Sequence, residues 1–208
     1  MRINSLHLPS LHIDLKKPLA KLGHEIADGF THVKDAFEDG AAQAVGYTEL
    51  LGIRYPVKKY QEQVSPELMR GSRLESSADY DALKAKGIKS VIDLTKEGTA
   101  DEKFVQQKGM NLLRVPILDN GHPTMDQMKT FLDFMSKPEN QPAYVHCEAG
   151  VGRTSIAVAC YRMAIQGWSA DKAIAEADKH GMKLPNQVNF LKDFDKALTA
   201  GQIPGYSR

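Results

Sequence analysis

The 208-residue sequence predicts an α/β fold in which helices flank a largely parallel central sheet of about four or five strands. Short apolar segments alternate along the chain with amphipathic or apolar segments of roughly ten to fifteen residues. Such alternation is typical of strand–helix–strand units, whose crossovers place parallel strands in one sheet. Because the alternation begins only after residue 60, we expect an N-terminal extension over 1–60 and one α/β domain over 61–208.

The extension is expected to contain one amphipathic helix over about 18–38. Its apolar residues are three or four positions apart, and charged residues fill the gaps: Leu19, Leu22, Ile26, Phe30, Val33 and Phe37. A helix of this kind suits a partner protein, a membrane surface or a second protomer. Because its charges are mixed rather than basic, we favour a helix that packs against the α/β domain.

Four strands and six helices of the α/β domain can be assigned to particular segments. The strands are apolar segments at 68–69, 88–94, 110–117 and 143–146. Capping residues and helical periodicity place helices at 77–85, 99–108, 124–135, 153–165, 169–180 and 186–198. The helix at 153–165 is apolar nearly all round, so we expect it to be the buried central helix.

Composition excludes several classes of protein. A hydrophobic content of 42% and a charged content of 25% are those of a soluble globular domain, and a net charge of +1 does not favour nucleic acid as a partner. Two cysteines cannot build a zinc cluster or a disulfide framework, so we expect no metal and no cofactor. No apolar run approaches the ~18 residues of a transmembrane segment. We expect a cytoplasmic protein, or one exported after a leader has been removed.

The segment 144–155 carries the chemistry. It combines an apolar strand, a loop with two glycines and the start of a helix. Such a loop directs its backbone N–H groups into one concavity, where the positive end of the helix dipole favours an anion. Gly150 and Gly152 can adopt positive φ, so the amides of the five residues between Cys147 and Arg153 can surround a phosphate: Glu148, Ala149, Gly150, Val151 and Gly152.

Each side chain of this segment suits one step of phosphate chemistry. The amides should stabilise the thiolate of Cys147 and make it a nucleophile. Arg153 offers a planar fork that matches two phosphate oxygens. Thr154, or Ser155 in its place, could donate a hydrogen bond to the sulfur, and His146 is expected to support the loop. The alternative is a buried structural cysteine beside a surface arginine. The second cysteine, Cys160, is expected in the core.

These residues also carry a family resemblance. His146-Cys147, five residues, then Arg153-Thr154 resembles the signature loop of the cysteine-dependent protein tyrosine phosphatase superfamily. The run His-Cys-Glu-Ala-Gly-Val-Gly-Arg-Thr at 146–154 resembles, more narrowly, the loop of bacterial phosphatase-like phytases, which remove phosphates from inositol polyphosphates. The resemblance implies a protein tyrosine phosphatase-like fold for residues 61–208.

A thiolate phosphatase needs an acid that protonates the leaving oxygen. Asp119 follows the strand at 110–117, on a glycine- and proline-containing loop that could carry the acid into the pocket. Phytases of this type place the acid in an Asp-His-x-Trp-Pro-Thr run, of which Asp119, Pro123 and Thr124 match. His122 is the alternative acid. A third interpretation makes Asp119 an ordinary turn residue.

Other pocket residues are suggested by the resemblance. The region of Arg70 and the loop after Leu94 are expected to border the site, so Arg70, Arg73 and Lys96 are candidate substrate contacts or plain surface charges. Thr95 stands where phytases tend to carry an arginine. Gln187 could orient the hydrolytic water, although we favour a surface position at a helix start. Glu148 is expected to tie the loop to a neighbouring segment.

The sequence therefore predicts a metal-independent cysteine phosphatase. Its expected substrate is a small anionic phosphate ester, an inositol polyphosphate such as phytate. The alternatives are a phosphoprotein, as for a protein tyrosine or dual-specificity phosphatase, and a binding module that holds a phosphorylated ligand without turnover.

Overall fold

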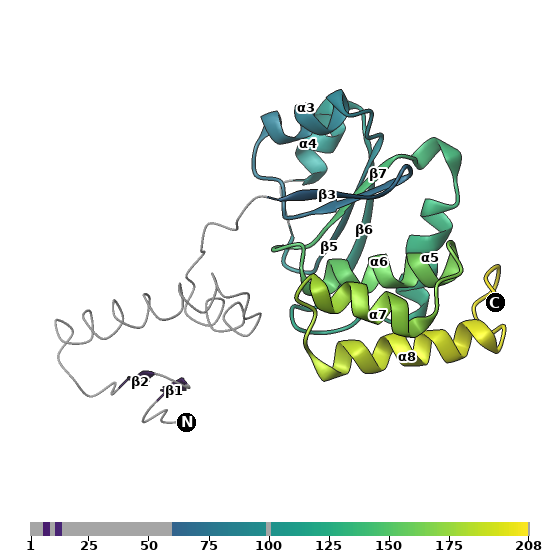
Figure 1. Ribbon diagram of the computed structural model, residues 1–208. Helices are drawn as coiled ribbons and strands as arrows, with labels where there is room; N and C mark the ends of the chain where they lie inside the picture. The colour runs from purple at the N-terminus through teal and green to yellow at the C-terminus, as the bar shows by residue number, and fades with distance from the viewer. Residues whose placement is uncertain (1–5, 9–10, 14–59, 99–100, 208) are drawn as a thin grey trace. The chain divides into compact units, whose positions relative to one another are not determined.

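A computed structural model describes residues 6–8, 11–13, 60–98 and 101–207 (Figure 1). The chain divides into two units, Met1–Arg54 and Tyr55–Arg208. In the first unit, β1 (Leu6–Leu8) pairs antiparallel with β2 (Leu11–Ile13). The helix that we expect over 18–38 lies outside the described residues.

The second unit is built on a five-stranded sheet in the order β3-β4-β7-β5-β6. The strands are β3 (Gln61–Ser65), β4 (Leu68–Gly71), β5 (Ser90–Thr95), β6 (Asn111–Ile117) and β7 (Ala143–His146). The strands β4, β7, β5 and β6 are parallel, and β3 pairs antiparallel with β4 at one edge of the sheet. The predicted α/β class and the largely parallel sheet are confirmed, with β7 as the middle strand.

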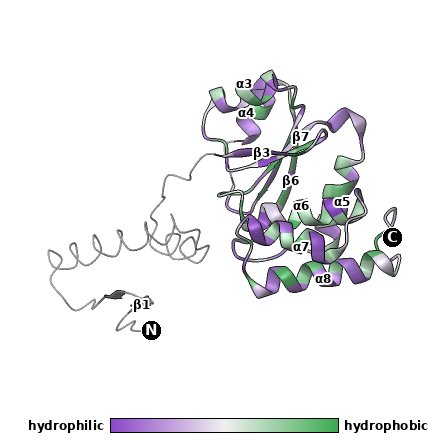
Figure 2. Ribbon diagram, in the orientation of Figure 1, coloured by the Kyte–Doolittle hydropathy of each residue, from purple (hydrophilic) through white to green (hydrophobic). Residues whose placement is uncertain are grey.

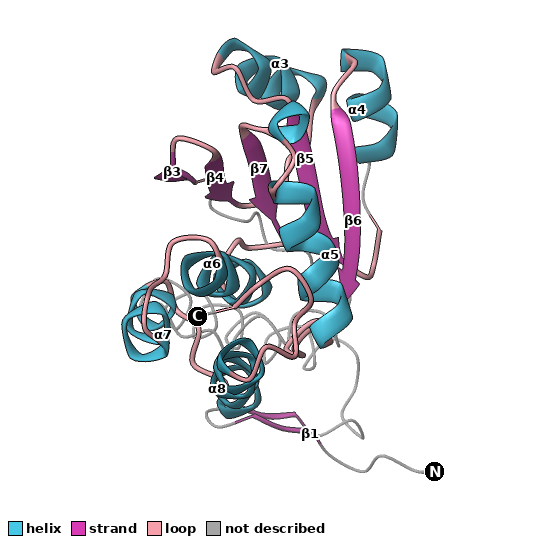
Figure 3. Cartoon of the chain, turned by 90° about the vertical axis from the view of Figure 1, so that its right-hand side faces the viewer, coloured by secondary structure: helices cyan, strands magenta, loops and turns pink. Residues whose placement is uncertain are grey.

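Helices cover both faces of the sheet (Figure 3). On one face, α3 (Ser77–Ala85) and α4 (Asp101–Lys108) pack on alternate strand residues such as Val91 and Tyr144. The opposite face, which includes Ile92 and Val145, is covered by a larger apolar cluster. That cluster contains residues of α5 (Met125–Met135), α6 (Gly152–Ala164), α7 (Ala170–Lys179) and α8 (Pro185–Thr199). A short 3-10 helix, η1 (Pro138–Asn140), precedes β7.

The helices follow their sequence patterns. Ser76 with Asp79, and Thr124 with Gln127, form the capping boxes that begin α3 and α5. Helix α6 is the buried central helix, as predicted, with nearly all of its residues in the core. Figure 2 shows hydrophobic positions along β6 and β7 and mixed positions along α8, as expected for a helix with one face in the core. Among the described residues, no helix combines the length and apolarity needed to cross a membrane.

Candidate active site

The nucleophile loop (residues 147–153) joins β7 to α6 and lies at the carboxyl end of the central parallel strands, where ligands bind in open α/β sheets. Cys147 is 3% exposed at its start. Gly150 has φ of 74°, and a Cβ there would overlap the carbonyl oxygen of Gly71, so a side chain would clash with the end of β4. Gly152 has no positive φ, contrary to our expectation; a Cβ there would lie 3.2 Å from Gln187 Nε2.

Arg153 connects three loops through one buried guanidinium. Its Nη1 donates to both carboxylate oxygens of Glu97 (2.8 and 2.9 Å) and to the carbonyl of Ile117 (3.1 Å). Its Nη2 lies 3.2 Å from Asp119 Oδ1. Burial lowers the pKa of Arg153, but the negative charges of Cys147, Glu97 and Asp119 raise it, and the net direction is upward. The guanidinium is therefore held charged and oriented at the loop.

Glu97 is a site residue that the sequence reasoning missed. It follows β5, just as Asp119 follows β6 and Cys147 follows β7. Because parallel strands end at the same edge of a sheet, their following residues meet there. The position of Glu97 after a predicted strand was the signal that could have identified it.

The acid loop (residues 118–124) brings Asp119 to the nucleophile loop, as the sequence predicts. Asp119 Oδ1 faces Arg153, and Oδ2 accepts a hydrogen bond from Asn120 Nδ2 (3.0 Å). Asn120 has φ of 56°, a left-handed conformation that asparagine tolerates better than most residues. The His122 ring stacks on Phe190 at 5.3 Å, so its ring contact is with α8.

Two side chains at the start of α8 hold the acid loop. Asn186 Nδ2 donates to the carbonyl of Asn120, and Gln187 Nε2 donates to the carbonyl of Gly121, both at 3.0 Å. Gln187 is 2% exposed, so the surface position that we favoured for it is wrong. The close packing of Gln187 on Gly152 buries its amide between the two loops.

Arg70 supports the nucleophile loop from within the protein. It is 1% exposed, and its Nη2 donates to the carbonyl of Gly150 (2.8 Å) and to Ser155 Oγ (2.7 Å). Tyr60, which the sequence reasoning did not single out, also donates to the carbonyl of Gly150 (2.7 Å) and accepts from Arg70 Nε (3.2 Å). Of the two interpretations offered for Arg70, a substrate contact or a surface charge, the surface charge is wrong.

The other two candidate substrate contacts, Arg73 and Lys96, differ in their surroundings. Arg73 Nη1 lies 3.0 Å from Glu148 Oε2, and the Arg73 backbone N–H donates to the carbonyl of Glu148 (2.9 Å). Glu148 thus ties the nucleophile loop to the segment after β4, as expected. Lys96 is exposed and precedes Glu97.

Comparison with known proteins places this geometry in a family. Residues 55–193 match the family described as DSP-PTPase phosphatase fused to NAD+ kinase. The chain belongs to this family. It is therefore a phosphatase of the protein tyrosine and dual-specificity superfamily, as the signature loop indicated.

Individual relatives of this phosphatase are distant. The human phosphatidylglycerophosphatase and protein-tyrosine phosphatase 1 is 26% identical over 183 residues, which cover 78% of this chain and 90% of the relative. The dual specificity protein phosphatase TpbA of Pseudomonas aeruginosa strain UCBPP-PA14 is 24% identical over 119 residues, 57% of this chain and about half (53%) of the relative.

A solved structure supports the fold. The core catalytic domain of the PP-IP phosphatase SIW14 from S. cerevisiae, in complex with citrate, superposes with a TM-score of 0.56 at 18% identity. The match covers 71% of this chain and 96% of that domain. The protein tyrosine phosphatase-like fold is thus confirmed.

The hydroxyls after Arg153 do not behave as predicted in this phosphatase. Thr154 is buried, and its Oγ1 has no hydrogen-bond partner among the described residues, so the expected bond to the sulfur is absent. Ser155 Oγ accepts from Arg70 instead. Cys160 is buried in the core as expected, and burial raises the pKa of its thiol well above the ordinary value.

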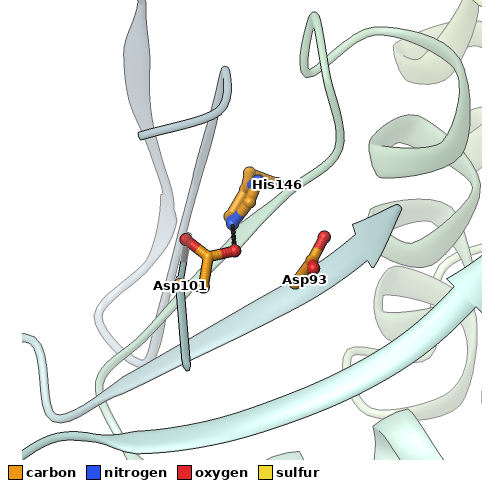
Figure 4. A group of neighbouring side chains, drawn as sticks. All are labelled: Asp93, Asp101 and His146. Carbon is orange, nitrogen blue, oxygen red and sulfur yellow. Dashed lines mark ion pairs between the residues drawn. The ribbon is translucent and has the colours of Figure 1, made fainter. Parts of the chain in front are cut away.

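His146 lies in a buried charged cluster (Figure 4) with Asp93 and Asp101, and one ligand atom of each lies within 4.8 Å of the others. The carboxylates already have protein partners. Asp93 Oδ1 accepts from the N–H (2.8 Å) and Oγ1 (2.7 Å) of Thr95, and Oδ2 lies 3.3 Å from Arg114 Nε. Asp101 accepts from the Tyr80 hydroxyl and lies beside His146. We therefore assign the cluster to ion pairing rather than to a metal.

Proposed function

We propose that this chain is a cysteine-dependent phosphatase that hydrolyses phosphate monoesters through a cysteinyl-phosphate intermediate. One observation supports this most. Arg153, which ends the loop that begins with Cys147, has its Nη2 3.2 Å from Asp119 Oδ1. Cys147, Arg153 and Asp119 thus lie at the carboxyl-end edge of the sheet. They are the groups that we assign to nucleophilic attack, charge stabilisation and proton transfer.

The proposed reaction has two steps. The Cys147 thiolate attacks phosphorus in line, the phosphorus–oxygen ester bond breaks, and Asp119 donates its proton to the leaving oxygen. The Asp119 carboxylate then accepts a proton from a water molecule that attacks the phosphorus, which breaks the sulfur–phosphorus bond and releases phosphate. Loop amides and Arg153 hold the equatorial oxygens in both steps, and each such donor is worth roughly 2.7–4 kcal/mol.

As substrate we propose an inositol polyphosphate such as phytate. Support comes from Glu148 in the nucleophile loop and from Asp119, Pro123 and Thr124 in the acid loop, which resemble phytases. SIW14 is described as a PP-IP phosphatase, but its likeness extends to the fold alone. Lys96, exposed after β5, is available to bind a second substrate phosphate.

A phosphoprotein is the second candidate substrate, because most of the candidate cations near the nucleophile loop already bind groups of the protein. Arg70 and Arg73 are engaged by loop groups, so two of the three candidate contacts are not free for additional phosphates. A substrate with one phosphate needs none of them. The name of TpbA describes a dual-specificity protein phosphatase, and that of the human relative also includes phosphatidylglycerophosphatase.

The test compares phosphate release from inositol hexakisphosphate, a phosphotyrosyl peptide and phosphatidylglycerophosphate in vesicles, with a chelator present. We expect turnover without divalent metal, fastest on the inositol phosphate, and none for Cys147→Ser, which should still bind the substrate. Preference for the peptide or the lipid would overturn the substrate assignment. Turnover by Cys147→Ser, or a metal requirement, would overturn the mechanism, and binding without turnover would indicate the binding module.

Lys96→Ala sharpens the substrate test. If Lys96 binds a second phosphate, the variant raises KM for inositol hexakisphosphate but leaves KM for the phosphotyrosyl peptide unchanged. Lys179→Ala, which removes an exposed lysine on α7, is the matched control and should change neither value.

A further inference from the structure

His146 lies beside two acidic side chains, Asp93 and Asp101 (Figure 4), and directly precedes the nucleophile in the chain. Its ring is fully buried, with Nδ1 3.0 Å from the carbonyl oxygen of Cys147 and Nε2 3.1 Å from Asp101 Oδ2. The second contact is an ion pair that falls short of hydrogen-bond alignment. The imidazole therefore bridges the backbone of the nucleophile and the first residue of α4.

These contacts determine where the protons are. A carbonyl oxygen only accepts hydrogen bonds, so Nδ1 must carry a hydrogen. Asp101 Oδ1 already accepts from the Tyr80 hydroxyl, and its ionised Oδ2 attracts a second hydrogen on Nε2. A ring with both nitrogens protonated is an imidazolium, so these contacts favour a positive charge beside the backbone of Cys147.

The charged groups around His146 also favour a protonated ring. Asp93 from β5 and Asp101 from α4 face the ring, Arg114 from β6 pairs with Asp93, and the aromatic ring of Tyr144 lies 5.8 Å away on β7. A protonated His146 adds a second positive charge, beside that of Arg114, opposite the two carboxylates. Burial lowers the pKa of His146, whereas Asp101, Asp93 and the Cys147 carbonyl raise it, and the net direction is upward.

We propose that Asp101 is a positioning residue for the nucleophile, which keeps His146 protonated and oriented so that a buried positive charge stabilises the Cys147 thiolate. Distance determines the sign of this effect. The His146 ring contacts the backbone carbonyl of Cys147, whereas Asp101 reaches Cys147 only through that ring. We therefore expect the cation to act on the thiolate more strongly than the carboxylate opposes it. Helix α4, on the far face of the sheet from α6, thereby takes part in the site.

The proposal rests on Cys147 as the nucleophile of the proposed function, but alkylation tests it without turnover. The rate at which iodoacetamide modifies Cys147 is measured from pH 4 to 9, with the modified cysteine identified by mass spectrometry. For Asp101→Asn, the pH of half-maximal rate should rise by about one unit, because His146 loses the partner that keeps it charged. If only the proposed function is wrong, iodoacetamide would still modify Cys147 with this pH dependence, but the chain would release no phosphate from its substrates.

Tyr80→Phe is the matched control. It removes the hydrogen bond that the Tyr80 hydroxyl donates to Asp101 and keeps the carboxylate charge, so it should perturb packing while shifting the alkylation midpoint by less than about 0.2 units. Equal shifts for Tyr80→Phe and Asp101→Asn would overturn the proposal, because the effect would then come from packing and not from charge.

Two further measurements establish the route through His146. In a His146→Asn background, Asp101→Asn should cause no additional shift of the alkylation midpoint, and an undiminished shift would contradict the proposal. Nitrogen-15 chemical shifts of the His146 ring in the unmodified chain should be those of an imidazolium at pH 7. A neutral ring would overturn the proposal even if Asp101→Asn fails to fold.

Discussion

At the scale of single residues, Asp119 is the group whose surroundings best match a change of role during catalysis. Its two oxygens face different partners, Arg153 on one side and the Asn120 amide on the other. The side chain is 19% exposed, which leaves it accessible to a leaving group or to water. A carboxyl group in this position can deliver a proton to one face of the pocket and later recover it.

Asp119→Asn should therefore slow hydrolysis in proportion to the basicity of the leaving group. We expect kcat to fall about 10²–10⁴-fold on an alkyl phosphate, whose alkoxide needs protonation, and far less on p-nitrophenyl phosphate. Initial rates on both esters measure this difference. His122→Asn is the control, because His122 is the alternative acid. A larger leaving-group effect in His122→Asn would transfer the role of the acid to His122.

The sequence was informative where chemistry depends on strand ends and uninformative where it depends on long-range packing. Cys147, Arg153 and Asp119 follow from a motif and from strand–loop–helix order, and the structure brings them together. The burial of Arg70 depends on Tyr60 and on a loop 80 positions away, which no local pattern encodes. Gln187 is likewise buried by Gly121 and Gly152, far from it in sequence.

At the scale of elements, the least predictable strand is β3. Its sequence Gln-Glu-Gln-Val-Ser is mostly polar and exposed, because an antiparallel edge strand covers little of the core. The first strand that the sequence predicts in the α/β domain is at 68–69, so β3 is not among the predicted strands. The parallel strands β5 and β7 were predictable because they are buried throughout between two layers of helices. The edge strand β6 is largely apolar in sequence and buries Val115 and Ile117.

Helix α8 is the element that determines the position of the acid loop. Asn186 and Gln187 each bind one carbonyl of that loop, and the double variant Asn186→Ala/Gln187→Ala removes both bonds. We expect kcat on an alkyl phosphate to fall by up to about a hundredfold, because a misplaced acid loses its alignment. Amide hydrogen exchange at 118–124 should accelerate in parallel. Lys192→Ala, on the same helix, is the control; unchanged exchange in the double variant would refute the positioning role.

At the scale of the whole molecule, the cluster around His146 connects the central strand β7 to α3 and α4 on one face of the sheet. The ring belongs to β7 and touches Asp101 of α4, and the Tyr80 hydroxyl of α3 binds the same carboxylate. On the opposite face, α6 begins directly after the nucleophile loop. A proton on His146 therefore stabilises the contact between β7 and α4, and its binding must be coupled to folding.

This coupling predicts how stability changes with pH. The raised pKa of His146 means that the native chain retains a proton that the unfolded chain releases near pH 6.5. The contribution is complete below about pH 6.5 and is lost as pH rises through the native pKa. The unfolding free energy should thus fall relative to that of His146→Asn, by at most about 1.4 kcal/mol per pH unit within this window.

Urea unfolding between pH 5.5 and 9 tests this prediction, with the fluorescence of Trp168, the one tryptophan of the chain, as the signal. Trp168 lies between α6 and α7, with Arg162 and Lys172 over its ring, so it reports on the domain that contains the site. The excess stability of the unmodified chain over His146→Asn should be constant below pH 6.5 and decline above it. A difference that stays flat over the whole range would mean that His146 is not held charged by its buried carboxylates. Folding would then bind no additional proton at this position, and the nucleophile would depend on the loop amides and Arg153 alone.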